Sequence, residues 1–163
     1  MEVARILREI ADLLEIGNAN AFRVRAYRNA ARTIEELPKA VQLIAGDASR
    51  LEELPGIGKD LAGKISEIVR TGTLPLLRKL ERSSPAGVSE IMRVRGVGPK
   101  RARILCRNLG IRSVSGLERA AKQKRIRRIR GFGAKTEEAI LHEIEGRRVD
   151  EKRVLRPAAI QYA

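Results

Sequence analysis

The sequence contains few aromatic residues and almost no cysteine. Only 2% of its 163 residues are aromatic, Trp is absent, and Cys106 is the single cysteine. A lone cysteine excludes an internal disulfide and a metal cluster built from several cysteines. Hydrophobic residues nevertheless make up 43% of the chain, so the core must consist of Leu, Ile, Val and Ala. This composition favours helices, because strands draw on aromatic and β-branched side chains.

The sequence also lacks a long apolar run. No segment approaches the roughly 18 consecutive apolar residues that a membrane span requires. The segment Met1–Gly17 has interspersed acids and does not have the layout of a signal peptide. We therefore expect no membrane partner and a cytoplasmic, nucleoid-associated location.

Acidic charge is scarce in the second half of the chain. The formal net charge is +14 and the pI is about 11.0. Residues 1–81 hold 13 Lys and Arg against 12 Asp and Glu, whereas residues 82–163 hold 21 against 8. A protein this basic usually binds a polyanion. The second half is therefore expected to supply most of the electrostatic attraction.

Hydrophobic spacing predicts helices along the whole chain. Apolar residues recur three and four positions apart between Val3 and Leu14, and a second helix is expected from about Ala21 to Leu37, where Pro38 interrupts it. No segment shows sustained period-two alternation. We predict an all-α fold in two small helical domains. The expected parts are residues 1–81, a linker at 82–87, a second domain at 88–147 and a tail at 148–163.

One short motif occurs three times, each time directly before a segment with helical spacing. It reads apolar-x-Gly-apolar-Gly, and its first glycines lie 40 and then 35 residues apart. A lysine follows within two residues of the second glycine in every copy. The three copies are Leu54–Lys59, Val94–Lys100 and Ile129–Lys135. The pattern predicts repeated helix-hairpin-helix motifs.

The motif has the physical properties of a phosphate-binding loop. Two glycines allow a tight turn, and the following helix presents unpaired N–H groups and the positive end of its dipole. We expect the chain to bind the backbone of duplex, nicked or gapped DNA with weak sequence preference and strong salt dependence. The scarcity of aromatics argues against stacking on single strands. The predicted DNA contacts are Gly56, Gly58, Lys59, Gly96, Gly98, Lys100, Arg101, Gly131, Gly133 and Lys135.

Two other interpretations of the glycines are weaker. A nucleotide-binding fingerprint needs a preceding strand and a third glycine, and neither is found at the required spacing. The glycines could also serve only as turns between helices, but a lysine at a similar place in every copy argues against this.

Three further features of the sequence bear on ligand binding. The segment Lys122–Arg130 has six basic residues in nine positions, and because it leads into the third motif, a role facing phosphate is favoured over a solvated surface. His142 lies among glutamates, and a metal site there would need a second converging ligand, so a solvated position is expected. Cys106, beside Ile104 and Leu105, is expected in the core.

Four blocks in this order resemble the N-terminal region of family X DNA polymerases, the DNA polymerase beta-like family. The phrase Phe22–Tyr27 is similar to the bacterial and archaeal branch. The blocks are Ala21–Ala31, Leu54–Ile65, Thr71-Gly72 and Val94–Leu105. The resemblance implies a DNA repair module, with a lyase-like domain over residues 1–81 and a duplex-binding subdomain over 88–147.

The catalytic palm of that family is absent from this sequence. A polymerase holds two metal ions with carboxylates, and neither the Gly-Ser motif nor the Asp-x-Asp pair of the palm is present. We expect no polymerase activity from this chain alone. The segment Val154–Ile160 resembles the start of a palm helix, so the chain is either a truncated or a naturally short relative. A palm domain or a partner chain is a possible further partner.

The resemblance also implies a 5′-deoxyribose-phosphate lyase site. In the family, a neutral lysine amine attacks the sugar aldehyde, a Schiff base forms, and β-elimination releases the phosphate. Lys64 matches the nucleophile, Tyr27 the site tyrosine, and Arg23 is expected to contact phosphate. Asp60, four residues before Lys64, can pair with it and favours its charged form. The chain departs from the family pattern at four places. Phe22-Arg23 stands where the family has a histidine-lysine pair, Asp60 and Leu76 where it has lysines, and Gly63 where it has a glutamate.

Two functions therefore remain open: a catalytic repair module and a non-catalytic DNA-docking module. No cofactor is required, but the resemblance implies that the first two hairpins could each hold a monovalent cation, Na⁺ or K⁺. The ligands would be the backbone carbonyls of Glu52, Leu54, Ile57, Met92, Val94 and Val97.

Overall fold

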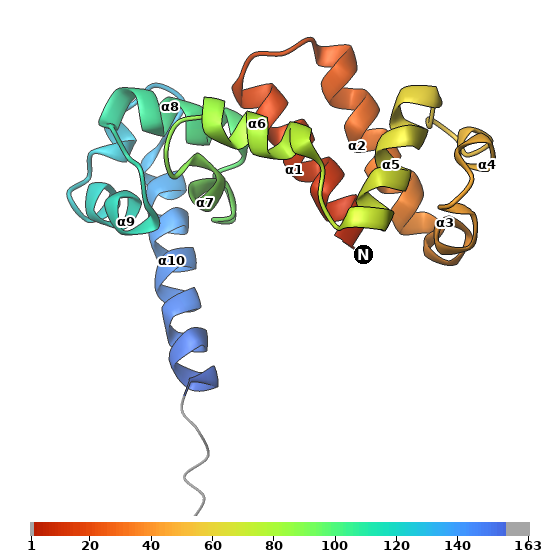
Figure 1. The fold of residues 1–163 in the computed structure, drawn as a ribbon. Coiled ribbons are helices and arrows are strands. Elements are labelled where there is room, and N and C mark those ends of the chain that lie inside the picture. Colours follow the sequence, from red (N-terminus) through yellow and green to blue (C-terminus); the bar gives the residue numbers. More distant parts are fainter. Residues whose placement is uncertain (1, 156–163) are drawn as a thin grey trace, which may run out of the picture. The chain divides into compact units, whose positions relative to one another are not determined.

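The computed structural model describes residues 2–155, apart from the side chain of Pro38. The chain divides into two compact units, Met1–Ser84 and Pro85–Ala163. All regular structure in the described residues is helical (Figure 1). The prediction of an all-α fold is confirmed, and each unit is described by itself.

The first unit contains six helices in the described residues. Helix α1 packs along α2 and also contacts α5 and α6. One face of α1 is buried throughout, as its spacing predicts, and each fully buried Leu or Ile contributes about 1.5–3 kcal/mol. The helices are α1 (Glu2–Ile16), α2 (Ala21–Glu36), α3 (Pro38–Ile44), α4 (Ala48–Glu52), α5 (Lys59–Thr71) and α6 (Pro75–Ser83).

Polar residues fix the ends and the pairing of these helices. The Asn20 side chain accepts a hydrogen bond from the Phe22 N–H at 2.8 Å and caps α2. The Arg28 guanidinium donates to Asp12 of α1 at 3.1 Å and also contacts Glu15. Because α3 begins at Pro38, the proline ends one helix and starts the next.

The second unit is built from shorter helices and one long one. Helices α7 and α9 contact each other, and α10 packs against α9 and η1. Gly87 comes so close to the Arg112 carbonyl that a Cβ atom there would lie 1.6 Å from the oxygen. The elements are α7 (Val88–Met92), α8 (Pro99–Leu109), α9 (Val114–Lys122), η1 (Ile126–Arg128, a 3₁₀ turn) and α10 (Ala134–Val154).

The element ends differ from the expected boundaries in two places. The expected linker at 82–87 begins inside α6, which continues to Ser83. Residues 148–154, expected in a tail, continue α10 instead. The resemblance of Val154–Ile160 to a palm helix falls mostly outside the described residues.

A membrane-crossing helix is not found among residues 2–155, since none is both long and apolar enough.

Candidate nucleic-acid interface

The three repeated loops close with the same backbone hydrogen bond. The N–H of the apolar residue between the glycines donates to the carbonyl three residues earlier. This bond joins Ile57 to Leu54 at 3.2 Å, Val97 to Val94 at 3.0 Å and Phe132 to Ile129 at 3.0 Å. The repeated sequence therefore folds into one repeated turn, although the third copy follows only the short turn η1.

The apolar residue of each loop is the anchor of its hairpin. Ile57, Val97 and Phe132 are 3%, 0% and 4% exposed. Since the anchor points inward, the glycines on either side of it lie at the surface. The loop backbone is therefore held rigidly by burial while its outer edge stays open.

The first glycine of each loop has a left-handed backbone. Gly56, Gly96 and Gly131 have φ angles of +75°, +89° and +90°. Side chains other than glycine rarely adopt this region. The turn itself therefore requires these glycines.

In two of the three loops, the backbone angles of the second glycine do not require glycine. Gly58 and Gly133 have φ near −88° and −89° with extended ψ, a conformation open to any residue. A Cβ atom at either position would meet no atom within 4 Å. Neither backbone strain nor packing requires glycine at these two positions. Each glycine is the N-cap of the following helix, a position that glycine suits, and the space in front of it is open.

The helices that follow the loops begin without a side-chain cap. No side chain accepts from the first N–H groups of α5, α8 or α10. Asn20, Asp47 and Ser113 cap α2, α4 and α9, while α3, α6 and α7 also begin without a side-chain cap. The hairpin helices therefore present unpaired donors and a positive dipole end. The predicted lysines Lys59, Lys100 and Lys135 are all exposed at these helix starts.

Arg101 connects the second and third hairpins. Its guanidinium donates to the Gly96 carbonyl at 2.8 Å and lies 5.8 Å from the centroid of the Phe132 ring. A guanidinium has five N–H donors, so Arg101 can hold both hairpins and still contact an anion.

Glu137 is a structural residue of the third hairpin that the sequence interpretation missed. Its position, four residues after the second glycine, matches the buried Ala62 and Ala102 of the other copies. The carboxylate, 2% exposed, accepts from the Arg127 N–H at 2.8 Å and from its guanidinium at 2.6 Å. It thus satisfies a donor that the short η1 turn leaves without a helical partner. An alignment of the three copies on their second glycine would have revealed this position.

The basic segment Lys122–Arg130 is only partly free to bind an anion. Lys122 pairs with Glu118 at 2.7 Å and Arg127 pairs with Glu137. The other four basic residues have no ion pair within the described residues, and all four are exposed. They are Lys124, Arg125, Arg128 and Arg130.

The first unit brings Lys64 and Tyr27 together. The Lys64 ammonium lies 5.7 Å from the centroid of the Tyr27 ring and forms an ion pair with Asp60. Tyr27 is 2% exposed, and its hydroxyl has no hydrogen-bond partner in residues 2–155. Partial burial lowers the pKa of Lys64, but Asp60 and the Tyr27 oxygen together raise that pKa above its ordinary value. The amine is therefore held in its charged form at neutral pH.

The other predicted site residues are Arg23 and the residues whose carbonyls were expected to bind a cation. Arg23 is exposed on α2. The carbonyls of Leu54 and Val94 accept the turn hydrogen bonds, and Glu52 and Met92 end α4 and α7.

Neither His142 nor Cys106 belongs to a metal site within the described residues. His142 is exposed, and within the described residues no three His, Cys, Asp or Glu side chains converge as a metal site. Cys106 is half-buried, and burial raises the pKa of its thiol.

Comparison with known proteins matches both units to one class of motif. Residues 1–74 match the helix-hairpin-helix domain, and residues 88–145 match the SAM-like helix-hairpin-helix tandem. The chain is 29% identical over 143 residues to the DNA polymerase/3'-5' exonuclease PolX of Bacillus subtilis (strain 168). That alignment covers 88% of this chain and 24% of the relative, so the chain spans about a quarter of its length. The chain therefore carries helix-hairpin-helix motifs in both units and is similar over most of its length to the N-terminal part of a family X DNA polymerase.

Proposed function

We propose that this chain binds the backbone of duplex or gapped DNA, independently of sequence, as a module of a DNA repair polymerase. One observation carries the proposal: all three loops combine an open glycine edge, an uncapped helix start and an exposed lysine. A phosphate accepts hydrogen bonds from such N–H groups and is attracted by the dipole and the lysine. The similarity to a DNA polymerase supports DNA as the polyanion.

The proposal is tested by measuring fluorescence anisotropy of labelled DNA with the variant Lys100→Gln/Lys135→Gln. The matched control is Lys152→Gln/Arg153→Gln, which removes the same charge near the far end of α10. The hairpin variant should weaken duplex binding and reduce the salt slope by about 1 per lost phosphate contact. The control should behave like the wild type. Equal affinity of the two variants would contradict the hairpin interface.

Preference for DNA structure is measured in the same assay. Nicked, gapped and continuous duplexes should all bind more tightly than a single strand of the same length, because the chain offers few aromatics for base stacking. Tighter binding to the single strand would argue against a duplex-binding module.

A second candidate function is 5′-deoxyribose-phosphate lyase activity through Lys64. It is favoured by the Lys64 ammonium, which lies 5.7 Å from the centroid of the buried Tyr27 ring. The neutral amine would add to C1′ of the sugar aldehyde and lose water to form a Schiff base. Loss of a proton from C2′ would then break the C3′–O bond and leave the DNA with a 5′-phosphate. Hydrolysis of the Schiff base by water would release the unsaturated sugar phosphate and regenerate Lys64.

Asp60 gives this candidate a sharp test. Because Asp60 helps to raise the pKa of Lys64, the fraction of neutral amine and the rate should increase as the pH rises toward that pKa. Asp60→Asn should shift the whole profile to lower pH. The measurement is borohydride trapping on nicked DNA that carries a 5′-deoxyribose phosphate, with Lys64→Ala as the control. An absent adduct, together with tight salt-sensitive binding, would identify a docking module instead.

We also propose that the first two hairpins each hold a Na⁺ or K⁺ ion through backbone carbonyls. The carbonyls of Glu52 and Met92 lie in the last turns of α4 and α7, where helical partners are missing. DNA affinity should be higher in KCl than in tetramethylammonium chloride of equal ionic strength. The same affinity in both salts would contradict cation binding.

A further inference from the structure

Helix α6 carries a row of basic residues that neither the hairpin motif nor the lyase site includes. Pro75, the pair Arg78 and Lys79, and the pair Arg82 and Ser83 recur three or four residues apart, so they share one face of the helix. We call this face the α6 strip. Leu77, on another side of the helix, is 8% exposed, and α6 packs against α1. The packing leaves the strip facing solvent.

The cations of the α6 strip are unpaired. Arg78, Lys79 and Arg82 are exposed and have no ion pair within residues 2–155. Some other arginines of the unit are neutralised: Arg5 pairs with Glu2 and Glu9, and Arg8 pairs with Glu35. Others, such as Arg50 and Arg70, are exposed and also have no ion pair within residues 2–155, but they are not part of a basic row on one helix. Like charges one helical turn apart, such as Arg78 and Arg82, repel each other. This repulsion would be relieved by an anion bound along the helix.

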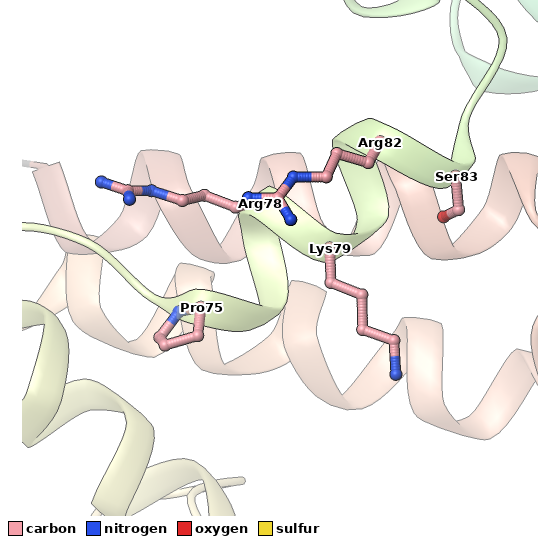
Figure 2. A pocket seen from close by; sticks show the side chains of 5 residues that line it. All are labelled: Pro75, Arg78, Lys79, Arg82 and Ser83. Atoms are coloured by element: carbon pink, nitrogen blue, oxygen red, sulfur yellow. The ribbon is translucent and has the colours of Figure 1, made fainter.

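The shape of the α6 strip favours an extended anion. Its five residues line a hollow of about 520 Å³ on the outside of a single helix. In Figure 2 the Arg78 and Lys79 side chains extend in different directions from the helix, so the cations do not converge on one point. Along the axis, Arg78 and Arg82 are about 6 Å apart. Such spread charges suit a series of phosphates more than a single one, and guanidinium groups bind phosphate in a bidentate manner.

The α6 strip is separate from the first hairpin. In Figure 1, α6 and the loop between α4 and α5 lie at different places in the first unit. A strand bound at the strip would therefore make contacts in addition to those of Gly56, Gly58 and Lys59.

From these observations we infer that the α6 strip is a second DNA-backbone site of the first unit. The inference rests on the proposed DNA-binding function and extends it. The ligand is a run of consecutive phosphates of one DNA strand, contacted chiefly by Arg78 and Arg82. The first unit has almost no net charge, but the α6 strip would still attract DNA phosphates locally.

The test is the salt dependence of duplex binding by the full chain, measured by fluorescence anisotropy. Arg78→Gln/Arg82→Gln removes two charges and keeps good helix formers. Two lost phosphate contacts should reduce the slope of log K against log salt by about 1.8. Between about 50 and about 200 mM salt, the variant should therefore lose about tenfold less affinity than the wild type. Arg78→Lys/Arg82→Lys keeps the charges and should retain the wild-type slope.

The matched control is Arg5→Gln/Arg8→Gln, which removes the same charge from the same unit at residues already paired with acids. It should leave the slope unchanged, and circular dichroism checks that both variants stay folded. An unchanged slope in the α6 variant, or an equal decrease in the control, would overturn the inference. If the α6 variant keeps its slope while Lys100→Gln/Lys135→Gln loses affinity, the proposed function stands without the α6 site. If the wild type binds no DNA, the proposed function itself fails.

Discussion

At the scale of single residues, Gly58 and Gly133 differ from Gly96 in what the fold requires of them. Both have extended backbone angles, and a Cβ atom at either would point into open space. Gly96 differs because its φ of +89° belongs to the left-handed region. The turn therefore requires glycine at Gly96, whereas the backbone of Gly58 and Gly133 is open to any residue.

This contrast leads to a prediction for Gly133→Val. Valine is a poorer N-cap than glycine by about 1 kcal/mol, but it reduces the entropy of the unfolded chain by a similar amount. The free energy of unfolding should therefore stay within about 1 kcal/mol of the wild type, while DNA affinity decreases because the side chain blocks the phosphate. Chemical denaturation and anisotropy measure the two quantities.

Gly96→Val is the comparison for that prediction. A valine held at positive φ is strained, so the free energy of unfolding should fall by about 1–3 kcal/mol along with DNA affinity. A stable Gly133→Val variant with wild-type affinity would show that no group approaches this edge of the loop.

At the scale of elements, buried carboxylates hold the second unit's helices in place. Glu118 of α9 is 5% exposed and pairs with Lys122 and, at 2.8 Å, with Arg148 of α10. The hydrogen bond from Lys122 outweighs the effect of burial and, with the charges of Arg148 and Lys122, lowers the pKa of Glu118 below its ordinary value. The contact ties the helix before the third hairpin to the helix after it.

Glu118→Gln should therefore destabilise the protein in a pH-dependent way. At neutral pH, loss of the charge should reduce the free energy of unfolding by about 1–3 kcal/mol. Because the folded pKa is lowered, the contribution of Glu118 is present above its unfolded pKa of about 4.3 and is lost as the pH falls through the folded value. Urea denaturation at several pH values should show the wild type and the variant converging in acid. A constant difference down to pH about 2 would contradict the assignment.

At the scale of the whole molecule, charge and repetition lead to one further prediction. Backbone recognition by hairpins reads no bases, so duplexes of unrelated sequence should bind with the same affinity. If roughly six to ten phosphates are contacted, affinity should fall about 10³–10⁵-fold between about 50 and about 200 mM salt. Competition titrations with two unrelated duplexes measure the first quantity. A strong preference for one sequence would require base contacts that the loops do not offer.

The sequence by itself determined the fold class and the three loops. The buried face of α1, the start of α2 and the position of each glycine turn all follow from local spacing. Such patterns are readable because helix periodicity and positive φ are local properties of the chain. The repeated motif therefore predicted both the hairpins and their exposed lysines.

Only the tertiary structure decided which charges are free. Arg127 and Lys122 belong to the same basic segment as Arg128 and Arg130, but buried acids neutralise the first two. The α6 strip is likewise hidden in a unit whose charges nearly balance. Ion pairs join residues that are distant in sequence, and burial sets their strength. A count of charges along the chain therefore cannot show where an anion would bind.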